Sequence, residues 1–432
     1  MKADFQNALG ALTDLVKINS IETPPVDDMP FGKGNADALA YTLNLLENLG
    51  FHTTNLENYC GYGEVGEGEL FGILGHLDVV PVGNGWTHPP FGAEIADGKL
   101  YGRGTMDDKG PMVACIFACA RLLQEGFTPK KRIRFILGCD EESGWKCMER
   151  YAKTEEMPVA GFSPDADFPV INCEKGIVYH TLSFPLPKSV YTLSAGTRAN
   201  VVPDYAEACL DYDEDVERIA LARGCNCSKE SGKLYLTAFG KSCHGSAPNK
   251  GINALIILLE ALGAAYGEFN ALYNAFYKFD GSGIGLKLYD KMSGSLTLNL
   301  GTAKAENGFA VFELDIRYPV SYKMGLITDI LKSSLPLCDI DRGSFHLPLY
   351  VPKDDPLVCA LLKAYNSVMK TDSKPISIGG GTYARFLPHG VAFGPQFPDT
   401  DATIHQKDEY IDLQDFQKMI DIYYTALKSL CF

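Results

Sequence analysis

The sequence lacks a long apolar run, an excess of basic residues and the cysteine spacing of a metal ribbon. No apolar segment reaches the roughly 18 residues that a membrane-spanning helix needs. Among its 432 residues 54 are acidic and 39 basic, so the formal net charge of −15 would repel nucleic-acid phosphates and anionic lipids. We therefore expect neither a nucleic-acid partner nor a membrane partner.

The N-terminal segment and the cysteines favour an intracellular protein. Residues 1–18 form an amphipathic pattern that Asp14 interrupts, unlike the continuous apolar core of a signal peptide. The 13 cysteines are scattered, with Cys225 and Cys227 as the only close pair. An intracellular chain keeps such thiols reduced. We expect a cytoplasmic protein whose cysteines pack as small apolar side chains.

Helical and strand patterns alternate in the first part of the chain. One helical stripe runs over Phe5–Val16, and a second, built on leucines, ends at Gly50. Strands are predicted at Leu70–Val80 and Arg132–Gly138, with a helix from Pro111 to about Glu125 between them. This alternation predicts an α/β domain with a sheet covered by helices.

The middle of the chain has a different pattern, rich in strands. Gly294–Gly301 and Phe309–Tyr318 lie on either side of Asn307-Gly308, which is a strong hairpin signal. Helical patterns at 252–267 and 323–335 lie among the strands, so a separate α+β unit is predicted.

Two later helices restore the first pattern, one over 356–369 and one that begins at Leu413. A chain of this length favours more than one core. Because the first pattern returns after the middle unit, we predict a discontinuous domain of residues 1–176 and 353–432, with residues 177–352 as an inserted domain.

His76 and Asp78 lie at the end of the first predicted strand. With spacing i and i+2 on a strand, both side chains would point to the same face, where a carboxylate can orient an imidazole or share its ligand. An isolated pair of this kind is usually incidental, because most histidines are satisfied by ordinary hydrogen bonds. A metal-binding role for the pair is therefore supported only if further acidic residues lie nearby.

Two acidic clusters supply such residues. Asp107 and Asp108 precede the helix predicted from Pro111, where carboxylates also serve as helix caps. Glu141 and Glu142 follow an apolar strand, and crowded carboxylates repel one another unless a cation or a proton intervenes. The carboxyl end of a strand is also where α/β sheets form ligand sites.

Asp165 and His405 complete a set of histidines and carboxylates that nearly all follow apolar runs. Mixed ligands of this kind suit zinc, cobalt or manganese rather than calcium or an iron–sulfur cluster. A purely structural zinc site would instead be closed and rich in cysteine. The set therefore predicts a catalytic metal site.

Several stretches carry a resemblance to a known family: GHLDVVPVGNGW (75–86), GRGTMDDKGP (102–111), DEESGW (140–145), SPDADFP (163–169), GKSCHGSAP (240–248) and GGGTYARFLPHGVAFGPQFPDT (379–400). Over nearly its whole length the chain resembles the zinc aminoacylase, carboxypeptidase G and succinyl-diaminopimelate desuccinylase family. Within that family it is similar to the peptidase V branch of dipeptidases, related to carnosinases. The resemblance implies a mixed-sheet catalytic domain with helices on both faces, an inserted α+β lid domain and two divalent metal ions. Zinc is the first candidate, with manganese and cobalt as alternatives.

The resemblance also implies a metal-binding role for five residues. One ion would be held by His76 and Asp165, and the second by Glu142 and His405. Asp107 would bridge both ions, because the bridging Asp of the family precedes a Lys-Gly pair by two positions, as Asp107 does here.

Further residues receive catalytic and substrate-binding roles from the same resemblance. Asp78 would steer the His76 imidazole, and Glu141 would be the general base. In the lid, His244 would stabilise the oxyanion together with Asn200. Taken alone, both lid residues are also typical of a turn.

Substrate contacts are implied for Arg317, which would grip the substrate carboxylate, although a plain strand salt bridge is nearly as good an interpretation. Gly380, Gly381 and Thr382 resemble a loop whose backbone meets the substrate. Asp165 stands where carboxypeptidase-like members carry Glu, which favours a dipeptide substrate. The enlarged lid favours a monomer.

Two alternatives stay open. An N-acyl amino-acid hydrolase of the same family, a deacylase or desuccinylase, would share the metals but need no carboxylate for a free amine. A non-catalytic peptide-binding protein on a peptidase scaffold would have lost a metal ligand or the base, and none is missing here. We therefore predict a metal-dependent dipeptidase.

Overall fold

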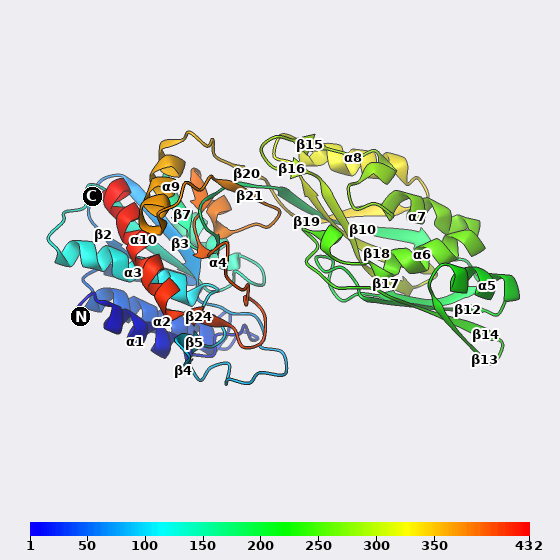
Figure 1. Cartoon of the computed structure of the whole chain (residues 1–432), viewed down its shortest axis with the longest axis horizontal. Helices are drawn as coiled ribbons and strands as arrows, with labels where there is room; N and C mark the ends of the chain where they lie inside the picture. Colours follow the sequence, from blue (N-terminus) through cyan, green and yellow to red (C-terminus); the bar gives the residue numbers. More distant parts are fainter. The chain divides into compact units, whose positions relative to one another are not determined.

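The computed structural model describes residues 1–432, which form two compact units. Unit 1 comprises residues 1–172, 351–376 and 382–432, and unit 2 comprises residues 173–350 and 377–381. Segments from both ends of the chain thus build unit 1, while the middle of the chain builds unit 2 (Figure 1). The predicted α/β class, with a mixed sheet and an inserted α+β part, is confirmed.

The core of unit 1 is a mixed sheet with the strand order β1, β2, β6, β3, β7, β22, β9. The central strands β6, β3, β7 and β22 run parallel, and the strands outside them pair antiparallel. Every residue of β3 is buried, as expected for a parallel strand covered on both faces. The strands are β1 (His52–Leu56), β2 (Cys60–Val65), β3 (Leu70–His76), β6 (Arg132–Gly138), β7 (Ala160–Ser163), β9 (Ile171–Glu174) and β22 (Gly390–Ala392).

Helices cover both faces of this sheet. A side chain at Gly75 of β3 would collide with Met112 of α3, and α10 packs against α3 on that face. On the opposite face a side chain at Gly138 of β6 would collide with Tyr383, and Tyr62 of β2 contacts α4. The helices are α1 (Phe5–Val16), α2 (Lys33–Asn48), α3 (Lys109–Gln124), α4 (Lys146–Thr154), α9 (Pro356–Met369), α10 (Leu413–Cys431) and the short η4 (Tyr383–Phe386).

Helix α3 and strand β3 differ from their predicted bounds. Helix α3 begins at Lys109, before the predicted start at Pro111, because the Met112 amide already donates to the carbonyl of Asp108, the residue before the helix, at 3.1 Å. Strand β3 ends at His76 and does not continue to Val80. The predicted bounds of α9 and the predicted start of α10 are confirmed; an aspartate side chain accepts from the first turn of each helix.

Unit 2 is built on an antiparallel sheet with the order β13, β14, β12, β11, β17, β18, β10, β19. Along β10, Val178 and Leu182 belong to the hydrophobic core, while Tyr179 and Thr181 alternate with them on the other face. The strands are β10 (Gly176–Pro185), β11 (Val190–Ala195), β12 (Tyr205–Asp211), β13 (Asn226–Glu230), β14 (Lys233–Phe239), β17 (Thr297–Glu306), β18 (Phe309–Tyr318) and β19 (Asp339–His346). The helices are α5 (Glu214–Ala222), α6 (Ala254–Ala265), α7 (Asn270–Phe276) and α8 (Met324–Ser334).

The hairpin predicted at Asn307-Gly308 is confirmed. Glu306 of β17 pairs with Phe309 of β18, and the two turn residues have φ values of 51° and 81°. Positive φ at both positions is what a tight turn between twisted strands requires. The strand predicted at Gly294–Gly301 is displaced, because β17 begins at Thr297 and runs on to Glu306.

Two further predictions concern the chain as a whole. None of its helices is both long and apolar enough to cross a membrane. All 13 cysteines are free thiols and most are buried, with Cys359 exposed. Their packing as small apolar side chains is confirmed for the buried ones.

Candidate metal centre

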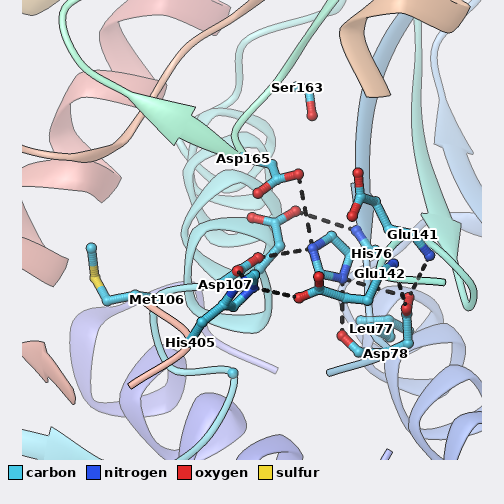
Figure 2. A network of polar contacts seen from close by, with 12 residues as sticks. His76, Leu77, Asp78, Met106, Asp107, Glu141, Glu142, Ser163, Asp165 and His405 are labelled. Atoms are coloured by element: carbon cyan, nitrogen blue, oxygen red, sulfur yellow. Dashed lines mark hydrogen bonds and ion pairs between the residues drawn. The ribbon is translucent and has the colours of Figure 1, made fainter. Parts of the chain in front are cut away.

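The candidate site lies at one edge of the unit 1 sheet. Strands β3, β6 and β7 are parallel neighbours, and His76 at the end of β3 pairs with Gly138 at the end of β6. Because parallel strands bring their carboxyl ends to the same edge, the residues that follow them converge. Figure 2 shows the converging side chains: His76, Asp78, Asp107, Glu141, Glu142, Asp165 and His405.

Helix α3 approaches this edge closely because Gly75 has no side chain. A Cβ atom at Gly75 would collide with the Asp108 carboxylate and with Met112. The start of α3 therefore packs directly on the end of β3, which places Asp107 beside His76. The His76 side chain is fully buried in this contact.

Asp107 contacts two imidazoles with its two carboxylate oxygens. Oδ1 lies 3.0 Å from His76 Nε2, and Oδ2 lies 2.8 Å from His405 Nε2. The two histidines come from distant parts of the sequence. The aspartate thus stands between two potential ligand groups.

Each imidazole has a second carboxylate neighbour. Glu142 Oε1 lies 2.9 Å from His405 Nε2, and Asp165 Oδ2 lies 3.8 Å from His76 Nε2. Two groups could each hold a cation, because their ligand atoms lie within 4.8 Å of one another. The groups are His76, Asp107 and Glu142, and His76, Glu141 and Asp165.

Asp78 takes part differently from the prediction based on strand spacing. The chain leaves the sheet after His76, and the ring Nδ1 lies 2.9 Å from the Asp78 carbonyl oxygen and 3.5 Å from its carboxylate. That carboxylate accepts the backbone amides of Glu141 at 3.1 Å and Glu142 at 3.0 Å. Asp78 therefore contacts the imidazole and also fixes the loop that carries both glutamates.

Asp108 contacts the backbone of His76 and forms no hydrogen bond or ion pair with either imidazole ring. It is fully buried, and its Oδ2 accepts the His76 backbone amide at 3.3 Å while Oδ1 has no hydrogen-bond partner. Burial raises the pKa of Asp108 well above its ordinary value. Of the two neighbouring aspartates, only Asp107 faces the imidazoles.

Burial and mutual repulsion dominate the electrostatics of the site. Burial and the charge of Asp107 raise the pKa of Asp165 to about 8, and burial with the charge of Asp165 raises the pKa of Glu141 well above its ordinary value. Burial would lower the pKa of His405, but Asp107 and Glu142 raise it to about 11. The two imidazoles are thus held by more carboxylates than they can neutralise.

This donor set fits a pair of divalent cations. Imidazole nitrogens mixed with carboxylate oxygens are ligands that zinc, cobalt and manganese accept. A divalent cation would also relieve the repulsion that raises the pKa of Glu141 and Asp165. The residues present therefore fit a two-metal centre on chemical grounds.

In unit 2, the predicted lid residues His244 and Asn200 lie side by side. Val201 forms a β-bridge with His244, and the Gly245 amide donates to the Asn200 carbonyl at 2.7 Å. The Ser246 amide donates to His244 Nδ1 at 3.1 Å, so the neutral ring carries its hydrogen on Nε2. Asn200 also lines a cavity of about 420 Å³ with Tyr179 and others.

Arg317 of unit 2 is buried against Asp315. Its Nε and Nη2 donate to the two Asp315 oxygens at 2.6 and 2.7 Å, and Nη2 also donates to Tyr179 Oη. Its Nη1 donates to the Gly379 carbonyl at 3.1 Å. The strand salt bridge is therefore present, and only the Nη1 side of the guanidinium faces away from Asp315.

The predicted substrate loop begins in unit 2 and ends in unit 1. Gly380 and Gly381 belong to unit 2, next to the glycine that accepts from Arg317. Thr382 belongs to unit 1, and its hydroxyl accepts the Ala384 amide at 3.2 Å, which starts η4. Contacts of these three residues with a substrate stay a prediction.

Two charged residues beside the site were not singled out from the sequence. Arg103 and Glu409 are both buried and form an ion pair at 2.7 Å. Arg103 lies in the stretch 102–111 that contains Asp107, and Glu409 follows His405 by four positions. Their closeness in the sequence to Asp107 and His405 could have drawn attention to them. The sequence gives no sign that the two residues pair with each other.

Comparisons with known proteins agree on one family. The profile of Peptidase family M20/M25/M40 matches residues 72–429. A protein of Bacillus subtilis named "Putative dipeptidase YtjP" is 41% identical over 447 residues, which covers 96% of each chain. Among solved structures, an M20 family metallo-carboxypeptidase of Sulfolobus solfataricus has a TM-score of 0.60 at 18% identity, with 98% of each chain covered. Human carnosine dipeptidase 1 has a TM-score of 0.57 at 16% identity, with 98% of this chain and 96% of that chain covered.

Proposed function

Because the chain belongs to Peptidase family M20/M25/M40, we propose that it is a metal-dependent dipeptidase that hydrolyses the peptide bond of unmodified dipeptides. The observation that carries the proposal is the position of Asp107, whose two carboxylate oxygens lie 3.0 Å from His76 and 2.8 Å from His405. A carboxylate in that position is suited to bridge two cations. The name of the Bacillus subtilis relative supports the substrate class.

The neighbours of each imidazole support the division of the remaining ligands. We assign His76 and Asp165 to one ion and Glu142 and His405 to the other, with Asp107 shared. Zinc is our first candidate, and the same ligands accept manganese or cobalt. When bound, such a pair of ions polarises the peptide carbonyl and lowers the pKa of a water molecule.

Glu141 is the proposed general base. Its carboxylate lies within the group that contains His76 and Asp165, and its amide is fixed by Asp78. In the proposed reaction Glu141 takes a proton from the attacking water as the oxygen bonds to the carbonyl carbon. The same carboxyl then gives that proton to the amine nitrogen as the carbon–nitrogen bond breaks. The products are two amino acids.

Unit 1 is the proposed catalytic domain, and unit 2 the proposed lid. The Nε2 hydrogen of His244 is the group we assign to the oxyanion, with Asn200 beside it. Arg317 remains the proposed partner of the substrate carboxylate, through its Nη1 side. A monomeric state and a cytoplasmic location stay predictions.

A substrate panel tests the proposed function. Metal-stripped protein would be given Ala-Ala, Ala-Ala-Ala and N-acetyl-alanine, before and after zinc, manganese or cobalt is added. Activity that appears only with metal, and on Ala-Ala alone, is the expected result.

Turnover of N-acetyl-alanine in place of Ala-Ala would contradict the dipeptidase assignment and favour a deacylase. Two bound metal ions without turnover of any substrate would favour a peptide-binding protein. The two outcomes are distinguishable because metal content is measured separately from turnover.

A further inference from the structure

Glu409 is buried between the two loops that carry Asp107 and His405. Its side chain is fully buried, although it follows His405 by only four positions in an exposed turn. A buried carboxylate is costly unless its oxygens are hydrogen-bonded. The partners of Glu409 therefore show what its burial achieves.

The carboxylate of Glu409 accepts from the loop that leads into Asp107. Its Oε1 accepts the backbone amides of Gly104 at 3.1 Å and of Met106 at 3.0 Å. Met106 immediately precedes Asp107, as Figure 2 shows, so Glu409 fixes the backbone at the residue before the proposed bridging ligand. The backbone carbonyl of Glu409 accepts from Gly102 at 2.9 Å and holds the start of the same loop.

Arg103 connects this loop to the segment around His405. Its Nη1 donates to Glu409 Oε2 at 2.7 Å and to the carbonyl of Gln406 at 3.2 Å. Gln406 is the residue directly after His405. The Nη1 nitrogen of Arg103 thus holds both ends of the short segment from Gln406 to Glu409.

The His405 segment needs such support. His405 itself has a φ of 65° and Asp408 a φ of 54°, a region that residues other than glycine adopt at a cost. Asp408 fixes the far side of the turn, because its carboxylate accepts the Thr87 amide at 2.7 Å and the His88 amide at 3.1 Å. These contacts therefore hold the backbone of the turn that carries the half-exposed His405 side chain.

We infer that Glu409, with Arg103 and Asp408, positions Asp107 and His405 so that both reach the second metal ion. None of the three touches a reacting atom; they are positioning residues. The inference rests on the proposed two-metal centre, and it adds that the affinity of the centre is set partly by a buried ion pair outside it.

A matched ion pair elsewhere in unit 1 separates positioning from mere stability. Arg134 donates to Glu64 through Nε at 2.9 Å and Nη2 at 2.7 Å, and Arg134 is buried like Arg103. Neither residue contacts the loops that carry Asp107 and His405. Glu64 is partly buried, whereas Glu409 is fully buried. Glu64→Gln therefore weakens an arginine–glutamate pair of unit 1 without touching the metal centre.

The experiment compares zinc affinity in Glu409→Gln and Glu64→Gln. Metal-stripped protein would be titrated with zinc against a competing chelator, after circular dichroism has shown that each variant is folded. We expect Glu409→Gln to weaken zinc binding by about 10- to 100-fold, and Glu64→Gln to leave it unchanged. Equal zinc affinity in both variants and the wild type would overturn the inference.

Asp408→Ala keeps the test informative if Glu409→Gln does not fold. Asp408 is only partly buried, so its loss frees the turn without emptying a buried site. We expect a smaller loss of zinc affinity, below about 10-fold. Wild-type affinity in a folded Asp408→Ala protein would overturn the role of this turn. Zinc affinity is measurable without turnover, so a failure of the dipeptidase proposal would be a separate result.

Discussion

Unit 1 surrounds two imidazoles with an excess of carboxylates, most of them partly buried, whereas unit 2 gives the buried guanidinium of Arg317 a single carboxylate partner, Asp315. In unit 1 His76 ends β3 and the other groups lie on loops, whereas in unit 2 both partners lie on β18 itself. The first arrangement converges from five distant segments, at residues 76–78, 107, 141–142, 165 and 405. The second is complete within three residues of one strand.

The pKa shifts show the consequence of this difference. In unit 1 burial and neighbouring carboxylates raise the pKa of Asp165 to about 8 and that of Glu141 well above its ordinary value. In unit 2 burial would lower the pKa of Arg317, but the charge of Asp315 outweighs it, so that pKa is raised and the guanidinium stays charged. The Arg317–Asp315 pair is neutral overall and needs no ligand. The carboxylates of unit 1 carry an excess of negative charge that a bound cation would neutralise.

The largest effect is expected from Glu141→Gln, which removes the proposed general base and leaves the shape of the side chain. Turnover of Ala-Ala should fall by about 100- to 10,000-fold because the amide cannot accept the proton of the attacking water. Zinc content after dialysis should stay near that of the wild type. The neighbouring Glu142→Gln is the matched variant and should lose zinc as well as turnover.

Glu141 also lies in a group that could hold a cation, so Glu141→Gln could lose zinc instead of keeping it. Loss of zinc from Glu141→Gln to the extent seen for Glu142→Gln would make Glu141 a ligand and would contradict its assignment as the base.

Breaking the balanced pair of unit 2 should have the next largest effect. Arg317→Ala leaves the Asp315 carboxylate buried without its partner, which should cost about 3–5 kcal/mol of unfolding free energy. Urea unfolding followed by circular dichroism measures this loss. The double variant Arg317→Met, Asp315→Leu should recover most of it, because no unpaired charge then remains. A double variant as unstable as Arg317→Ala would show that the pair is not self-contained.

Chelation should affect one unit and not the other. Zinc at about 1,000 times its dissociation constant would stabilise the protein by about 4 kcal/mol, and a chelator would remove that contribution. Hydrogen exchange should then quicken at the amides of Glu141 and Glu142, which donate to Asp78 in unit 1. The amides of the β17–β18 hairpin in unit 2 are the internal control and should exchange as before. An equal increase of hydrogen exchange in both units would show that metal removal does not act on unit 1 alone.

The smallest effect is a pH dependence of unit 2 that comes from His180. Burial, with the charges of Arg342 and Lys332, lowers the pKa of this histidine to about 4, and its Nδ1 has no hydrogen-bond partner. The unfolded chain therefore binds a proton below about pH 6.5 that the folded chain does not bind until about pH 4. Stability should be full above pH 6.5 and fall on acidification by an amount on the order of 3 kcal/mol.

His180→Asn tests this assignment, because asparagine does not titrate. Urea unfolding at a series of pH values should show a shallower loss between pH 6.5 and 4 in the variant than in the wild type. The same slope in both proteins would show that other groups cause the acid sensitivity.

Much of unit 1 could be predicted because its signals are local. Asp355 and Asp412 begin α9 and α10 by capping them, and apolar runs mark β3 and β6. Since parallel strands end at one edge of a sheet, acidic residues after such runs were expected to converge, and they do. Their positions after apolar runs indicated this convergence, and the family resemblance supplied the role of each residue.

The remaining features depend on contacts between distant segments, which sequence spacing does not contain. Strand β3 ends at His76, earlier than predicted. The Asp78 carboxylate accepts the amides of residues 141 and 142, more than 60 positions away. The ion pair of Arg103 with Glu409 joins segments 306 positions apart. Neither residue of that pair shows by its type alone whether it will be buried or exposed.

The most direct test of the account is anomalous X-ray scattering from crystals of zinc-loaded protein, measured at the zinc edge. Two peaks are predicted, one beside His76 and Asp165 and one beside Glu142 and His405, with Asp107 between them. A single peak, or peaks that do not share Asp107, would contradict the proposed two-metal centre.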